Sequence, residues 1–134
     1  MRRPSPRTAL LLLGAYVCIP AALVLGPLPV HLLDTVTWRI QDLFDWVGLD
    51  PASVQRLDVE RVSNILIFAP VGLFVAWALP KLSGTSVLLI CAAAATAIEL
   101  FQWAVLSSRY PSGYDVLFNT SGAAIGITVA RSRA

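Results

Sequence analysis

The sequence predicts an all-α membrane protein: a bundle of four transmembrane helices with one amphipathic helix at the membrane interface. Hydrophobic residues make up 57% of the 134 residues, charged residues make up 13%, and the mean hydropathy is +0.72. A soluble domain averages about 45–50% apolar and about 25% charged residues. The apolar residues also gather in long runs, and about 20 of them suffice for a helix to cross about 30 Å of hydrocarbon.

Residues 1–134 are expected to form a single membrane domain, because no segment between the apolar runs is long enough to be a linker. The net charge of +2 and the scattered arginines give no support for nucleic-acid binding. The chain has one histidine and no C-x-x-C pair, so neither a metal site nor another cofactor is expected. Cys18 and Cys91 lie within apolar runs and are expected to be free, buried thiols.

The first predicted transmembrane helix covers residues 8–28 and follows a short basic tail that contains Arg2, Arg3 and Arg7. A basic tail before an apolar run is also typical of a secretory signal peptide. This run is long for a signal peptide, and no clear A-x-A cleavage site follows it. We therefore expect a retained helix, kinked at Pro20 as membrane helices tolerate.

Residues 31–47 predict an amphipathic helix that does not cross the membrane. Its apolar residues fall within an arc of about 120° at about 100° per residue, and three aspartates lie on the other side. Trp38 and Trp46 are typical of a membrane interface. We expect this helix on the extracytoplasmic side, over the mouth of the bundle and packed on other helices. Asp50-Pro51 then predicts the start of a short helix or turn within residues 51–60.

The other three transmembrane helices are predicted over residues 62–80, 86–106 and 114–130. Pro70 lacks the N–H that would bind the carbonyl of Leu66, so a kink is expected there. Six basic residues then lie on one side of the membrane and four on the other: Arg2, Arg3, Arg7, Lys81, Arg131 and Arg133 against Arg39, Arg56, Arg61 and Arg109. Because basic residues favour the cytoplasmic side, both termini are expected in the cytoplasm.

Polar side chains within the apolar runs are the best candidates for function. Glu99 and Gln102 are three residues apart, and the last predicted helix carries polar and small residues at i, i+4, i+7 and i+11: Asp115, Asn119, Gly122 and Gly126. Such spacings place each set on one helix face. A carboxylate inside a membrane is costly, which makes it a candidate functional group. The predicted ligand-binding residues, all in the outer half of the bilayer, are Asn64, Glu99, Gln102, Arg109, Asp115 and Asn119.

Several of these residues also have a purely structural interpretation. Asp115 is well placed to cap its helix, and Gln102 and Asn119 are suited to hydrogen bonds between helices. Gly122 and Gly126 form a G-x-x-x-G pattern, which is typical of close helix packing. Helix packing is accordingly assigned to Pro70, Gly72, Gly122 and Gly126.

The motifs, taken in chain order, resemble the VanZ-like family of small bacterial membrane proteins. The matching pieces are Asn64-x3-Phe68-x-Pro70-x-Gly72, Ile98-Glu99-x2-Gln102, Arg109, and Asp115-x3-Asn119-x2-Gly122-x3-Gly126. They cover about residues 60–130. The resemblance implies a multi-pass protein of the bacterial plasma membrane. The family's namesake is associated with resistance to teicoplanin, a lipid-bearing glycopeptide antibiotic.

Three functions fit this sequence. In the first, an outward-facing polar pocket binds a polar head group. The head group belongs either to a cell-wall lipid precursor or to an amphiphile such as a glycopeptide antibiotic. Membrane lipid is the other expected partner. In the second, Glu99 and Asp115 act as acid and base in an enzyme for an envelope lipid. In the third, Gly122 and Gly126 bind another membrane protein in a structural or assembly module. A transporter finds little support, since paired broken helices are not evident.

Overall fold

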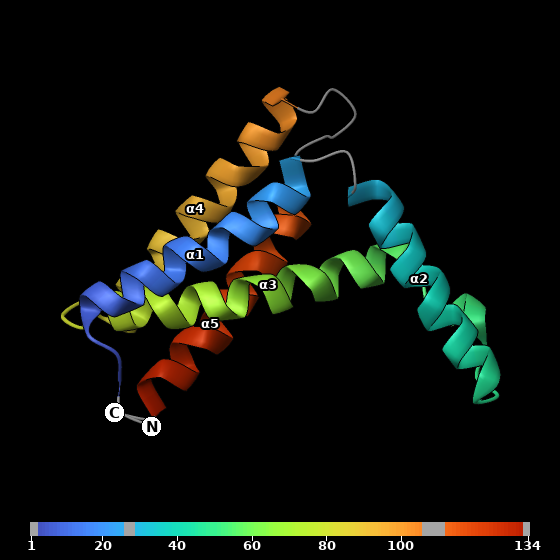
Figure 1. Cartoon of the computed structure of the whole chain (residues 1–134), viewed down its shortest axis with the longest axis horizontal. Helices are drawn as coiled ribbons and strands as arrows, with labels where there is room; N and C mark the ends of the chain where they lie inside the picture. Colours follow the sequence, from blue (N-terminus) through green and yellow to red (C-terminus); the bar gives the residue numbers. More distant parts are fainter. Residues whose placement is uncertain (1–2, 26–28, 106–111, 133–134) are drawn as a thin grey trace.

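In the part of the chain that the structure describes, residues 3–25, 29–105 and 112–132, the computed structural model contains helices and no strands (Figure 1). In chain order the elements are α1 (Pro6–Leu25), α2 (Pro29–Trp46), the short 3-10 helix η1 (Pro51–Ser53), α3 (Arg56–Ala78), α4 (Gly84–Val105) and α5 (Gly113–Ser132). The prediction of an all-α chain is therefore confirmed.

Two of these helices, α3 and α4, are long and apolar enough to cross a membrane on the described residues. Within α1 the side chains that the structure describes continuously give an apolar stretch of Pro6–Cys18, which by itself is shorter than a span. Helix α5 is less apolar because it carries Asp115, Asn119, Ser121 and three glycines. The structure thus gives five α-helices of which two are candidate spans, where the sequence predicted four spans.

Helix α3 begins at Arg56, six residues before the predicted span, because its first turn is capped. The Gln55 side chain and the backbone of Asp58 form one half of a capping box. In the other half, the Gln55 backbone N–H donates to Asp58 Oδ2 at 3.2 Å. This reciprocal pairing satisfies backbone donors at a helix start. The charged residues of the first turn therefore belong to α3, which then continues through Pro70 as one helix.

The Asp50-Pro51 start is confirmed by η1. The Ala52 backbone N–H donates to Asp50 Oδ1 at 2.9 Å, and Pro51 occupies the first turn. Here Asp50 plays the role of the N-cap residue, as predicted from its side-chain oxygen.

Glycines allow α3 and α5 to approach until their backbones touch. An added Cβ would overlap backbone atoms of the opposite helix at three positions, which are Gly72 against Ala123, Gly122 against Ile65 and Gly126 against Ala69. Glycines of both helices take part, so each helix offers the other a surface without side chains at these positions. The buried apolar core lies between α3, α4 and α5, toward the ends of α3 and α5 and the start of α4. It comprises Ala76, Val87, Cys91, Ala123, Ile127 and Ala130.

Helix α1 lies antiparallel to α3 (Figure 1). The Tyr16 hydroxyl donates to the Ile67 carbonyl oxygen at 3.0 Å, and its ring meets the Phe74 ring edge-on with centroids 6.1 Å apart. Arg3, which precedes the helix, donates to the Ala130 carbonyl oxygen at 2.7 Å. Cys18 on this helix is exposed, so the prediction that both cysteines are buried was wrong for Cys18 and right for Cys91. Cys18 lies on a face that the other helices leave uncovered.

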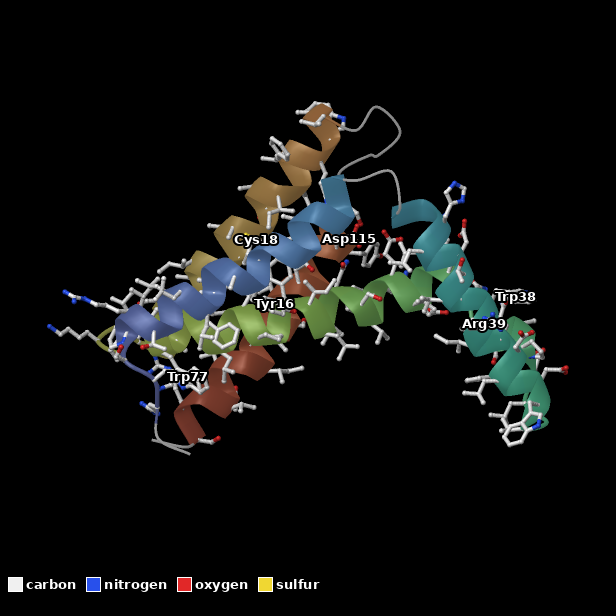
Figure 2. The ribbon with its side chains drawn as sticks, in the orientation of Figure 1. Tyr16, Cys18, Trp38, Arg39, Trp77 and Asp115 are labelled. Carbon is white, nitrogen blue, oxygen red and sulfur yellow. The ribbon has the colours of Figure 1, made fainter. Side chains whose placement is uncertain are left out.

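Helix α2 lies beside the start of α3, away from α4 and α5 (Figure 1). Arg56 pairs with Asp34 at 3.3 Å, and the Gln41 amide donates to the Val54 carbonyl oxygen at 2.8 Å. In the described residues α2 makes no contact with α4 or α5. The expectation that it covers the mouth of the bundle was therefore wrong, because these two interactions hold it against η1 and the start of α3. Figure 2 shows Trp38 and Arg39 on this separate helix.

The glycine contact makes a first prediction. Gly126→Leu should lower the stability of the folded chain by about 1–3 kcal/mol, because the new side chain overlaps the α3 backbone and overpacking typically costs this much. Thermal unfolding in detergent, followed by helix content, measures it. Gly14→Leu is the matched control, since a Cβ at Gly14 meets nothing within 4 Å. Equal stability of the two variants would contradict the close α3–α5 contact.

Candidate functional site

The site is built where α3 and α5 begin and α4 ends, beyond the glycine contact. The Asn64 amide Nδ2 on α3 donates to Asp115 Oδ1 on α5 at 3.1 Å. Both residues are half-buried. Figure 2 shows Asp115 near the centre of the molecule, at the start of α5. The two helices that touch through glycine backbones are thus joined, near their starts, by a bond between side chains 51 residues apart in sequence.

Ser112 connects this pair to Glu99 on α4. The Ser112 backbone N–H donates to Glu99 Oε2 at 3.2 Å, and the Ser112 Oγ accepts from the Asp115 backbone N–H at 3.3 Å. Ser112 precedes the first residue of α5, so its hydroxyl acts as an N-cap. One residue therefore touches both carboxylate-bearing residues of the predicted site.

Three predicted site residues are deeply buried. Glu99 is 7% exposed, Gln102 5% and Asn119 4%. Buried polar groups need hydrogen-bond partners, since an unpaired one costs a large part of its solvation energy. On α4, Glu99 and Gln102 continue the buried stripe of Cys91 and Ala95. The buried stripe of α4 is therefore apolar near the start of the helix and polar near its end.

Arg61 is a cation at this site that the sequence analysis did not single out. Its guanidinium lies 5.8 Å from the ring centroids of both Tyr114 and Phe118 on α5, and it pairs with Asp58 at 3.3 Å. An arginine within about 6 Å of an aromatic face is attracted to it. Since Asn64 follows Arg61 by three residues on α3, the guanidinium stands one turn from the Asn64–Asp115 pair.

Both missed residues had a signal in the sequence. Ser112-x-x-Asp115 before an apolar run is the spacing of a helix cap, and Arg61 and Asn64 share the spacing that puts residues on one helix face. Arg109, the cation that was predicted instead, lies outside the described residues. Its role stays a prediction.

The geometry defines a class of protein: a small helical protein with two candidate membrane-spanning helices and a buried cluster of carboxylate and amide side chains at one end. Residues 13–133 match the family model described as VanZ/LLP1. The chain therefore belongs to the VanZ-like family, and the match includes α2 and the part of α1 from residue 13 onward, which the motif resemblance did not cover. No curated protein matches the chain, and neither does any solved structure.

The Asn64–Asp115 bond makes a prediction that a double-mutant cycle checks. Asn64→Ala and Asp115→Ala should each destabilise the chain, and their effects should couple by about 0.5–1.5 kcal/mol, because the second change removes a partner already lost. Thermal or denaturant unfolding of the four proteins measures the coupling. Pairing Asn64→Ala with Thr128→Ala, near the far end of α5, is the control and should be additive within about 0.5 kcal/mol. Additivity in both cycles would show that the bond contributes nothing.

Proposed function

We propose that the chain is a multi-pass membrane protein in which α1, α3, α4 and α5 cross the bilayer and α2 lies at the interface. The four helices contain 20, 23, 22 and 20 residues, which is the length a span requires. Their directions alternate in Figure 1, so that α1 and α4 begin at the end of the molecule where α3 and α5 finish. The polar Asn119 of α5 is buried against the other helices, which explains how a less apolar helix is accommodated among spans.

We further propose that the polar cluster binds a polar head group presented at the outer face of a bacterial plasma membrane. The observation that carries this proposal is the burial of three polar side chains on α4 and α5, together with Ser112, which links Glu99 to the Asn64–Asp115 pair. Helix packing alone seldom requires a buried carboxylate in a membrane, whereas ligand sites commonly contain one. Glu99 and Asp115 are acceptors for amino or hydroxyl groups of a ligand.

A cation beside the cluster adds a second specificity, for anionic groups of the ligand. Arg61 stands over two aromatic rings with part of its side chain exposed, and Arg109 belongs to the connection between α4 and α5. Guanidinium groups bind phosphate and carboxylate through paired hydrogen bonds. The ligand class that combines anionic and hydroxyl or amino groups on a lipid includes cell-wall lipid precursors and lipid-bearing glycopeptides. A role in glycopeptide resistance would follow from binding either one.

The four-span arrangement predicts which single cysteines share a side of the membrane. In a chain with Cys18 and Cys91 replaced by alanine, Ser5→Cys and Lys81→Cys should react with an impermeant maleimide from one side, and Ala52→Cys from the other. All three positions are exposed. If only α3 and α4 crossed, Ser5→Cys would label together with Ala52→Cys. Ser5 therefore decides between the two arrangements.

The ligand proposal predicts that Glu99→Ala abolishes binding while the chain still inserts. Binding of a soluble teicoplanin-type glycopeptide and of a purified cell-wall lipid precursor to the detergent-solubilised protein measures this, alongside antibiotic susceptibility of cells that express it. We expect a loss of at least about tenfold, since removing a charged hydrogen-bond partner costs about 1.5–3 kcal/mol.

Asp45→Asn, which removes an exposed carboxylate on α2, is the control and should bind like the unmodified chain. Unchanged binding in Glu99→Ala would overturn the proposal. Conversion of the lipid by the unmodified protein, lost in Glu99→Gln, would replace it with the enzyme in which Glu99 and Asp115 act as acid and base.

A further inference from the structure

The acidic residues gather at one end of the molecule. The eight acidic residues all lie at the end that holds the polar cluster and α2: Asp34, Asp42, Asp45, Asp50, Asp58, Glu60, Glu99 and Asp115. The opposite end, where α1 and α4 begin and α3 and α5 finish, carries Arg3, Arg7, Lys81 and Arg131 among its described residues (Figure 1). These four cations thus have no acidic residue at their own end, an arrangement that favours the approach of anions.

A groove of about 500 Å³ opens between α4 and α5 at this basic end. Its lining combines the apolar Leu88, Ala124 and Ile127 with the polar or basic Thr85, Thr128, Arg131 and Ser132. Apolar and basic residues in one groove match a molecule with an anionic head and a hydrocarbon tail.

Arg131 lines this groove and is anchored beside it. Its Nη2 donates to the Leu82 carbonyl oxygen at 2.6 Å, in the turn that precedes α4. Its Nε lies 3.4 Å from the point where a Cβ on Gly84 would stand. A guanidinium has five N–H donors in a planar fork, so one bond to Leu82 leaves donors for the oxygens of a phosphate.

We propose that this groove binds an anionic phospholipid of the leaflet that adjoins the basic end. Arg131 contacts the phosphate, Lys81 and Arg3 add attraction, and an acyl chain lies along Leu88 and Ile127. Gly84 and Thr85, the first two residues of α4, also line the groove, and N–H groups at a helix start favour an anion. Basic pockets between membrane helices bind anionic lipid head groups for these reasons. The site is separate from the polar cluster, because it lies at the other end of α4 and α5.

Lipid binding by the full-length protein tests this proposal. Native mass spectrometry in detergent should show phosphatidylglycerol retained at least about fivefold more strongly than phosphatidylcholine, which is the effect of about one basic residue near an anionic head group. Arg131→Gln should remove most of this preference. Gly84→Leu should do the same without changing charge, because its side chain enters the groove; Gly84 does not have a positive φ, so leucine fits the backbone.

Arg39→Gln is the matched control, since it removes the same charge from exposed α2 at the acidic end and should keep the full preference. Helix content and unfolding temperature of each variant show whether it is folded. An equal preference in all four proteins would overturn the site. Glycerol phosphate that competes as well as the lipid would also overturn it, because the apolar residues of the groove would then have no part in binding.

Discussion

The contact between the backbones of α3 and α5 is the constraint on which the rest of the structure depends. It exists because Gly72, Gly122 and Gly126 have no side chain to hold the two helices apart. In a membrane, where water does not drive helices together, such close packing is a main source of association. The same contact brings Asn64 within hydrogen-bonding distance of Asp115. The glycine packing and the polar cluster therefore depend on each other. A substitution at these glycines that separates the helices would also move Asn64 away from Asp115.

The two ends of the molecule differ in chemistry because each helix changes character along its length. Helix α4 is buried through Val87, Cys91 and Ala95 and then through Glu99 and Gln102. Helix α5 shows the opposite order, with Asn119 early and Ile127 and Ala130 late. Since α4 and α5 are antiparallel, the polar part of one lies beside the polar part of the other, and the apolar parts do the same. The result is a polar cluster at one end and, at the other, an apolar core with cations around it.

The helices and most of the site could be predicted from sequence, because both rest on local spacing. Apolar runs of span length predicted α1, α3, α4 and α5, and spacings of three and four residues placed Glu99 with Gln102 and Asp115 with Asn119. What failed depends on contacts between distant residues. The hydrogen bond from the Gln41 amide to the Val54 carbonyl oxygen helps to set the position of α2. The spacing of apolar residues along the helix cannot predict such a bond.

Other differences have equally specific causes. Residues 51–60 were expected to form a short helix or turn ahead of the next helix, whereas the Gln55–Asp58 box starts α3 at Arg56, within that stretch. Arg61 was counted only as a charge that sets membrane orientation. Its contact with Tyr114 and Phe118 arises only when α3 packs against α5, so the spacing within one helix could not predict it.

The Tyr16 bond has a mechanical consequence for α3. Pro70 leaves the Leu66 carbonyl without its usual backbone donor, so the ladder of α3 is weakest there. Tyr16 binds the neighbouring Ile67 carbonyl from α1, and its ring reaches Phe74 beyond the proline. Helix α1 therefore bridges the weak point and stiffens α3 across it. A chain that lacked this tyrosine would retain both halves of α3 but gain freedom in the angle between them, and the two ends of the protein would bend independently.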